Sequence, residues 1–170
     1  MTAESDGAGR AWLLGDDIDT DVLAPGLYMK GPIEELASHC LEAVNIDFAN
    51  NVKPGDFVVA GRNFGMGSSR EQAAQALKHL GITAVLARSF AGIFYRNALN
   101  LGLPALVCDA TETIVAGDRL RIDLAVGKIE NLTQGATLAC EEIPKHLLEL
   151  VRDGGLVPHL EKLFSAKEKP

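Results

Sequence analysis

The 170-residue chain predicts an α/β domain in which a parallel sheet and a smaller antiparallel sheet carry helices. From residue 12 to residue 108, short apolar runs alternate with segments of helical periodicity, which favours parallel βαβ units. From residue 119 to residue 140, polar and apolar residues alternate instead, which predicts antiparallel strands. Apolar residues make up 47% of the chain and charged residues 23%, as in globular domains.

The first elements are a strand, a helix and a second strand. The apolar run at 12–14 predicts a short buried strand, and an acidic loop follows it at 15–21. Apolar side chains at helical spacing predict a helix over 33–44, and Pro32 stands where a first helical turn accepts proline. The apolar run at 57–60 predicts the second strand.

A glycine-rich loop, residues 61–67, leads from that strand into the next helix. Ser68 and Glu71 have the spacing of a capping box, so we expect the helix to begin at Ser68. Gly81 is expected to end it, because glycine accommodates the left-handed conformation at this position. The parallel part is then completed by strand 82–87, helix 90–101 and strand 103–108.

The last third of the chain predicts a β-hairpin, a strand and two helices. Their expected positions are strands 119–124, 128–132 and 136–140, a helix that Pro144 opens and Gly154–Gly155 ends, and a helix at 157–164. Residues 1–10 and 165–170 are small, polar or charged, so we expect flexible tails around a single domain at 11–164.

Charge and cysteine content exclude several classes of protein. The net charge is −7, without the basic face of a nucleic-acid binder or the polybasic segment of a membrane-surface protein. No apolar run approaches the roughly 18 residues of a membrane span, and no signal segment begins the chain. Cys40, Cys108 and Cys140 form neither a disulfide framework nor a C-x-x-C metal loop. We therefore expect a cytoplasmic protein with reduced thiols and no metal ligands of its own.

The glycine loop and the helix after it are the strongest candidate site. A helix N-terminus that follows glycines can bind an anion through its backbone N–H groups and its dipole. Arg70 can hold a carboxylate through two hydrogen bonds, and the same positive field favours an ionised hydroxyl on Ser68. The spacing matches neither a dinucleotide fingerprint, a Walker loop nor a hydrolase elbow. The alternative is a strand–helix turn with two capping serines.

The acidic segment 17–21 opens like a calcium-binding EF-hand loop, but it lacks glycine and glutamate at the sixth and twelfth positions. For Asp16 and Asp17 we expect a solvated turn. Asp21 lies next to an apolar stretch and is the better candidate for burial and for orienting a partner.

Lys30 lies in a loop, residues 28–31, where it could meet an anionic substrate or simply be a surface lysine. The histidines share no ligand spacing, so no metal site is expected from them; they are His39, His79, His146 and His159.

The two motifs Gly15-Asp16-Asp17-Ile18-Asp19-Thr20-Asp21-Val22-Leu23-Ala24-Pro25 and Gly65-Met66-Gly67-Ser68-Ser69-Arg70-Glu71 together resemble the 3-isopropylmalate dehydratase small-subunit family. This family corresponds to the swivel domain of aconitase. The resemblance covers about residues 11–164, with further matches at 34–37, 89–91 and 93–98. It implies a swivelling β/β/α fold with one parallel and one antiparallel sheet.

The resemblance also implies an activity and a partner. Such a hydro-lyase isomerises 2-isopropylmalate and 3-isopropylmalate in leucine biosynthesis, by dehydration and rehydration. A [4Fe–4S] cluster acts as the Lewis acid on the departing hydroxyl, and the large subunit binds it. The small subunit binds no cluster and is active only in the heteromeric complex.

The resemblance assigns roles to matching residues of this chain. Ser68 matches the serine that removes the proton α to a carboxylate, and Asp21 matches an aspartate at the edge of the active site. Ser69 and Arg70 match residues that hold the substrate carboxylate, and Gly67 belongs to the same substrate-binding motif.

The substrate is less specified than the reaction. Lys30 lies in the loop that reads the substrate's variable group, where an apolar loop suits an isopropyl group and a lysine favours an extra carboxylate. Gln72 stands where many relatives have histidine, and Gly92 where arginine is common. One alternative is therefore the small subunit of a related hydro-lyase, such as homoaconitase or dimethylmalate dehydratase. Another is a non-catalytic anion-binding module in which Ser68 is only a helix cap.

Overall fold

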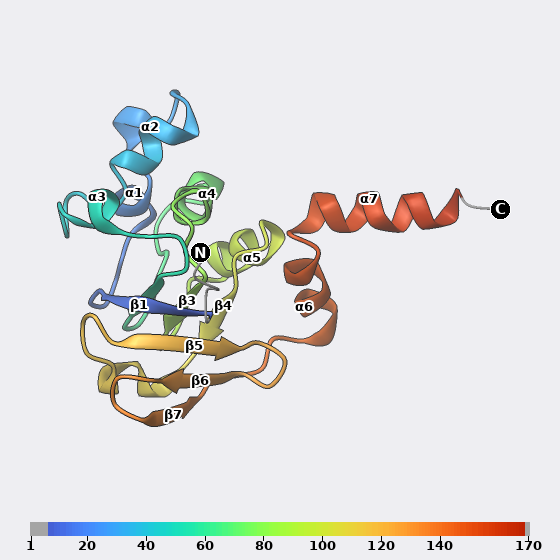
Figure 1. The fold of residues 1–170 in the computed structure, drawn as a ribbon. Coiled ribbons are helices and arrows are strands. Elements are labelled where there is room, and N and C mark those ends of the chain that lie inside the picture. The colour runs from blue at the N-terminus through green and yellow to red at the C-terminus, as the bar shows by residue number, and fades with distance from the viewer. Residues whose placement is uncertain (1–6, 169–170) are drawn as a thin grey trace, which may run out of the picture.

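In the computed structural model, which describes residues 7–168, seven strands form one mixed sheet in the order β4-β3-β2-β1-β5-β6-β7 (Figure 1). Strands β1 to β4 are parallel, and β5, β6 and β7 extend the sheet in antiparallel fashion. The strands are β1 (Ala8–Leu13), β2 (Phe57–Ala60), β3 (Ala84–Ala87), β4 (Ala105–Val107), β5 (Arg119–Asp123), β6 (Lys128–Asn131) and β7 (Ala136–Ala139).

Strand β1 joins the parallel part to the antiparallel part. Its first half, 8–10, pairs antiparallel with β5, and its second half, 11–13, pairs parallel with β2. The two expected sheets are both present and are continuous through this strand. The expected tail at 1–10 is wrong for residues 8–10, which belong to β1. Their sequence contains a glycine and an arginine, so it lacks the apolar run that predicts a buried strand. Residues 1–6 lie outside the described residues.

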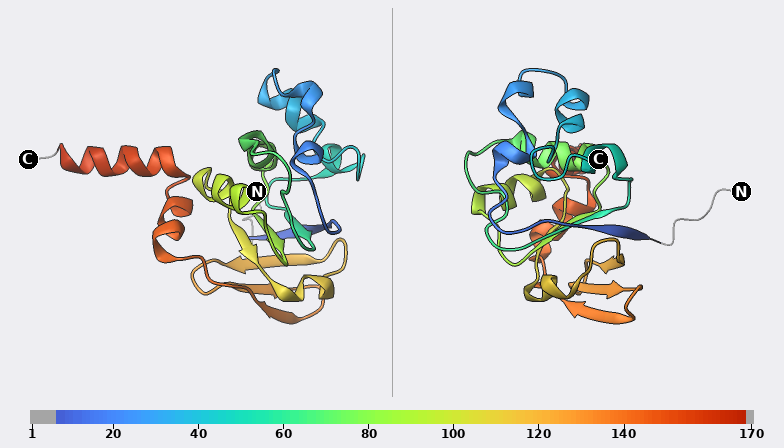
Figure 2. Two further views of the ribbon diagram at one scale, coloured as in Figure 1. Left: turned by 180° about the vertical axis from the view of Figure 1, so that it is seen from behind. Right: turned by 90° about the vertical axis from the view of Figure 1, so that its left-hand side faces the viewer.

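The helices cover the parallel strands and the end of the antiparallel part. They are α1 (Thr20–Leu23), α2 (Ile33–Ser38), α3 (Phe48–Asn51), α4 (Glu71–His79), α5 (Gly92–Asn100), α6 (Lys145–Arg152) and α7 (Leu156–Lys167), with short 3-10 helices η1 (Gly26–Tyr28) and η2 (Asp109–Thr113). Figures 1 and 2 show α7 extending away from the sheet. None of the helices in residues 7–168 is both long and apolar enough to cross a membrane.

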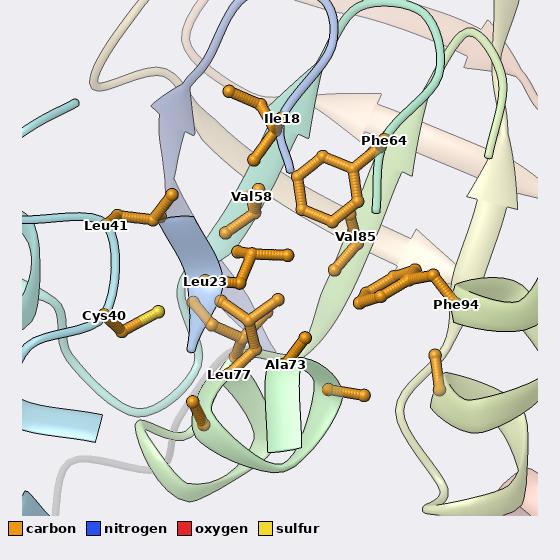
Figure 3. Close-up of a cluster of buried hydrophobic side chains, with 14 of the residues drawn as sticks. Ile18, Leu23, Cys40, Leu41, Val58, Phe64, Ala73, Leu77, Val85 and Phe94 are labelled. Atoms are coloured by element: carbon orange, nitrogen blue, oxygen red, sulfur yellow. The ribbon is translucent and has the colours of Figure 1, made fainter. Parts of the chain in front are cut away.

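Two apolar cores lie on opposite faces of the parallel strands. Successive residues of a strand point to opposite faces, so Val58 contributes to one core while Phe57 and Val59 contribute to the other. In the first core, helix α4 packs Leu77 against Leu23 (Figure 3). Burial on both faces explains why the parallel strands are continuous apolar runs without alternation.

Several helix boundaries differ from the sequence prediction. The helix expected over 33–44 ends at Ser38, and the chain then turns through Leu41, whose φ of 62° is incompatible with a continuing right-handed helix. Helix α4 begins at Glu71 with Arg70 as its N-cap residue, and no side chain caps it. The capping box expected from Ser68 is therefore wrong. Helix α7 continues to Lys167, into the segment expected to be a flexible tail.

Candidate active site

Two motifs that lie far apart in the sequence pair directly with each other. The Gly65 N–H donates to the Ile18 carbonyl at 2.8 Å, and the Thr20 N–H donates to the Met66 carbonyl at 2.9 Å. The motif at residues 15–25, the acidic motif, follows β1, and the glycine loop follows β2, so both leave the carboxyl ends of neighbouring parallel strands. Ligands of open α/β sheets bind at this edge. This pairing brings together the two motifs that carry the family resemblance.

The glycine loop needs glycine at two positions for steric reasons. Gly65 has a φ of 80°, and a Cβ there would lie 2.3 Å from the Cβ of Phe94. Gly67 has a φ of 99°, and a Cβ there would lie 2.9 Å from a carboxylate oxygen of Asp19. Between them and β2, Phe64 is fully buried and makes an edge contact with Phe94 at 5.0 Å between ring centroids. The aromatic side chain anchors the loop while its glycines follow a path closed to other residues.

Ser68 lies at the exposed end of this loop, before helix α4 begins. Its Oγ lies 3.2 Å from Oγ1 of Thr20, which is 1% exposed. The interpretation of Ser68 as a helix cap is excluded, because α4 starts three residues later. Thr20 was not among the candidates from sequence. The only signal for it was its place in the acidic motif, because a threonine gives no periodic sign of burial.

Arg70 is held in place by two groups of the acidic motif, the Asp21 carboxylate and the Ala24 carbonyl. Its Nη1 donates to the Ala24 carbonyl at 3.0 Å and forms an ion pair with Asp21. The Asp21 side chain is 63% exposed, so the expectation that it is buried is wrong. The expected role of Asp21 in orienting a partner stays a prediction, and the ion pair identifies Arg70 as the group it contacts. Asp19 accepts the Asp21 N–H at 2.6 Å and thereby caps α1.

Ser69 and Lys30 are placed differently from the Arg70 cluster. Ser69 is exposed next to Ser68, at the same end of the loop. Lys30 is also exposed, between η1 and α2, and the structure does not bring it into contact with Ser68 or Arg70. The 3-10 helix η1, which precedes Lys30, does approach the arginine, since a Cβ at Gly26 would lie 3.8 Å from Arg70 Nη2.

The first two aspartates of the acidic motif support the glycine loop. The Asp16 carboxylate accepts the Arg62 N–H at 2.7 Å, and the Asp17 carboxylate accepts Nδ2 of Asn63 at 3.1 Å. Both aspartates are exposed, as expected of a solvated turn. Their contacts add a function that the expectation did not include, because they fasten one loop of the site to the other.

Comparison with known proteins shows the family and the fold of this chain. The protein-family model of the aconitase C-terminal domain matches residues 34–111. The 3-isopropylmalate dehydratase small subunit 2 of Archaeoglobus fulgidus is 50% identical over 156 residues, which cover 91% of this chain and 94% of that protein. The chain belongs to the 3-isopropylmalate dehydratase small-subunit family. Its predicted fold class is confirmed by the structure of the Methanocaldococcus jannaschii 3-isopropylmalate dehydratase, with a TM-score of 0.89, 45% identity, and coverage of 95% of this chain and 98% of that one.

Within this small-subunit family, names differ in substrate. The methanogen homoaconitase small subunit of Methanothermobacter thermautotrophicus is 49% identical over 154 residues, which cover 89% of this chain and 88% of that protein. The hydro-lyase class predicted from the two motifs is confirmed at the level of the family. Roles of individual residues remain predictions.

Proposed function

We propose that this chain is the small subunit of a heteromeric 3-isopropylmalate dehydratase, which interconverts 2-isopropylmalate and 3-isopropylmalate in leucine biosynthesis. The observation that carries the proposal is the pairing of residues 18–20 with residues 65–66. This pairing puts a serine hydroxyl and a fixed guanidinium at the carboxyl ends of β1 and β2.

In this proposal, Ser68 removes the proton from the carbon α to the substrate carboxylate. A serine acts as a base only if its oxygen is stabilised as an anion. The hydroxyl of Thr20 is within reach to donate a hydrogen bond to Ser68 Oγ, at 3.2 Å. The N-terminus of α4, three residues later, adds a positive dipole field.

Arg70 binds the substrate carboxylate in the same proposal. Asp21 and the Ala24 carbonyl both engage Nη1, which fixes the plane of the guanidinium. The remaining N–H groups of a planar guanidinium can then donate two parallel bonds to a carboxylate. Ser69 and the backbone at Gly67 are exposed beside it and complete the carboxylate site. Asp21 therefore acts by orienting Arg70.

The [4Fe–4S] cluster of the family does not fit the donor groups of this chain. Within residues 7–168, no three His, Cys, Asp or Glu side chains gather at one point. Cys40 is buried alone in the first core, and Cys108 and Cys140 lie elsewhere. We therefore assign the cluster, which supplies the Lewis acid, to the large subunit. Neither nucleic acid nor membrane is a partner in this proposal, and its reduced thiols favour a cytoplasmic location.

A related hydro-lyase with a substrate of the homoaconitate type is the second candidate. The similarity to the methanogen homoaconitase small subunit and the exposure of Lys30 both favour it. Turnover of both substrate types by the complex, compared between wild type, Lys30→Val and Lys30→Arg, separates the two. If Lys30 reads an additional carboxylate, Lys30→Val loses that substrate selectively while Lys30→Arg keeps it. Selectivity that neither change affects removes Lys30 from the specificity loop.

The central test is the activity of the reconstituted complex with variants of Ser68. Ser68→Ala should lower kcat by about 10² to 10⁴, with KM nearly unchanged, as expected for the loss of a general base. Ser165→Ala, on the exposed surface of α7, is the matched control and should retain wild-type activity. Size-exclusion chromatography should show the same assembly for both variants. Wild-type turnover by Ser68→Ala would contradict the role of Ser68 as base.

The carboxylate role of Arg70 is tested separately. Arg70→Lys keeps the charge but loses the planar fork, so the KM for substrate should rise by roughly tenfold or more. Asp21→Asn removes the ion pair while keeping the shape, and we expect a smaller effect of the same kind. A fall in kcat alone, with KM unchanged in both variants, would show that Arg70 does not bind the ground-state carboxylate.

A further inference from the structure

The two edge strands of the sheet, β4 and β7, approach each other through the segments that follow them. The Glu141 N–H, two residues after β7, donates to the carbonyl of Val107 in β4 at 2.8 Å. The segment that follows β7 is therefore joined to β4 by a main-chain hydrogen bond. Because β4 belongs to the parallel set and β7 runs opposite to it, the chain directions are antiparallel at this contact.

Each of these two segments carries a cysteine beside the contact. Cys108 follows Val107, and Cys140 precedes Glu141. In an antiparallel arrangement the two cysteines are the next pair across from each other. Cys108 Sγ lies 3.7 Å from the carbonyl of Ala139, the residue before Cys140, so the Cys108 side chain points toward the segment that carries Cys140. Both cysteines are reduced in the structure.

We propose that Cys108 and Cys140 form a reversible redox site, which a small peroxide converts to a disulfide that joins the two edges of the sheet. The pair is placed by main-chain contacts, so no large movement of the backbone is needed to bring the sulfurs together. The closed loop would contain η2 and the strands β5, β6 and β7, which is the whole antiparallel part of the domain.

Cys108 is 1% exposed and Cys140 is partly exposed, so a small peroxide would approach the pair from the side of Cys140, and the pKa values favour Cys108 as the sulfur that reacts first. The hydrogen bond from the Cys140 thiol lowers the pKa of Cys108 to about 7, against the effects of burial and of Asp109, and the Ala110 N–H lowers it further. Cys140 has a raised pKa, because its proton is held by Cys108 and because it is partly buried. Thiolates, not thiols, attack peroxides.

The proposed oxidation proceeds in two balanced steps. The Cys108 thiolate attacks one oxygen of hydrogen peroxide; the S–O bond forms, the O–O bond breaks, and hydroxide leaves. This step oxidises Cys108 to a sulfenic acid and reduces the peroxide. The Cys140 sulfur then attacks the Cys108 sulfur, so that the S–S bond forms and the S–O bond breaks. The departing hydroxide takes the Cys140 proton and leaves as water.

Cys40 is the internal control for this site. It is fully buried in the other core, next to Leu23 and Leu77 and away from the edge strands (Figure 3). Burial raises its pKa, so it stays protonated and unreactive. An oxidant that modifies cysteines without selectivity would be revealed by a product at Cys40.

The experiment treats the full-length chain with hydrogen peroxide and maps the products by mass spectrometry of non-reduced peptides. We expect one intramolecular Cys108–Cys140 disulfide per chain, removed by a dithiol reductant, in wild type and in Cys40→Ala. In Cys140→Ala the second sulfur is missing, so Cys108 should accumulate as a sulfenic acid. Dimedone should trap this sulfenic acid as one adduct per chain.

Three results would overturn the proposal. One is the absence of the Cys108–Cys140 peptide while the chain remains folded by circular dichroism. The second is a disulfide between two chains through Cys140. The third is a disulfide that forms only when denaturant is present, because the folded structure would then not place the sulfurs together. The readout is thiol chemistry of this chain alone, so it is independent of the proposed dehydratase activity.

Discussion

Replacement of Asp118 by asparagine should destabilise the domain at the junction between its two halves. Asp118 is 4% exposed and precedes β5. Its Oδ2 accepts hydrogen bonds from the Val115 N–H at 2.9 Å, from Asn131 Nδ2 at 2.7 Å and from Gln134 Nε2 at 2.6 Å. Its backbone carbonyl accepts the N–H of Ala11, in the second half of β1. One carboxylate oxygen therefore organises the start of the antiparallel part.

The magnitude follows from the charge of the acceptor. Hydrogen bonds to charged groups contribute about 1.5–3 kcal/mol, and neutral ones about 0.5–1.5 kcal/mol. Asp118→Asn can keep the three bonds but makes them neutral, which removes about 1 kcal/mol from each, and the lower desolvation cost of the amide offsets part of this loss. We expect the free energy of unfolding to fall by about 2–3 kcal/mol. For a chain of this size, Tm should fall by about 4–12 °C.

Urea unfolding followed by circular dichroism measures this difference. Asp47→Asn is the matched control, because Asp47 is exposed and its side chain takes no part in capping α3. It should change the free energy of unfolding by no more than about 0.5 kcal/mol. An Asp118→Asn chain as stable as this control would refute the assignment of Oδ2 as a structural acceptor.

The lowered pKa of Asp118 predicts that the loss of stability in Asp118→Asn depends on pH. The hydrogen bond from Asn131, followed by that from Val115, lowers the pKa of Asp118 below its ordinary value of 3.8, although burial acts in the opposite direction. Between the two pKa values the unfolded chain binds more protons, so acid favours unfolding. The stability difference between wild type and Asp118→Asn should be constant above about pH 5 and should shrink as pH falls below 3.8. A difference that does not change with pH contradicts the lowered pKa.

Two further variants test the candidate site. Thr20→Val removes the hydroxyl 3.2 Å from Ser68 Oγ and keeps the shape of the side chain. The kcat of the reconstituted complex should therefore fall about 3- to 10-fold with KM unchanged. A change in KM alone would argue against a positioning role for Thr20. Gly65→Ala combines a φ of 80° with a Cβ 2.3 Å from the Phe94 Cβ, so urea unfolding should show a loss of about 2–4 kcal/mol. Gly135→Ala, where φ is 67° but no atom lies within 4 Å, isolates the backbone strain, and an equal loss in both variants would exclude the steric contact.

The parallel part of the fold was predictable because its strands are buried on both faces. Residues 57–60 are all apolar and coincide with β2. The buried face of α4, the helix after the glycine loop, consists mainly of alanines at helical spacing. The first half of β1 was not predictable, since residues 8–10 are stabilised by pairing with β5 and not by an apolar pattern. The end of α2 at Ser38 also depends on tertiary packing, because the apolar spacing continues after it.

The candidate site was predictable as a set of residues and not as an arrangement. The local pattern at Ser68 satisfied the rule for a helix cap, but the pairing with the acidic motif draws the chain away from helical geometry until Glu71. For Asp21, the apolar neighbours suggested burial, whereas the side chain points to solvent and pairs with Arg70. Thr20, one residue earlier, is the buried member.

By itself, the sequence determined the α/β class, the sites of the main turns and the motifs that identify the family, because these depend on local periodicity and on residue type. Only the tertiary structure decided which groups meet. It paired segments about 46 residues apart in the sequence, set Ser68 against Thr20, and joined the edge strands beside two cysteines. Such contacts depend on sheet order and curvature, which arise from the packing of the whole chain and have no local signature in the sequence.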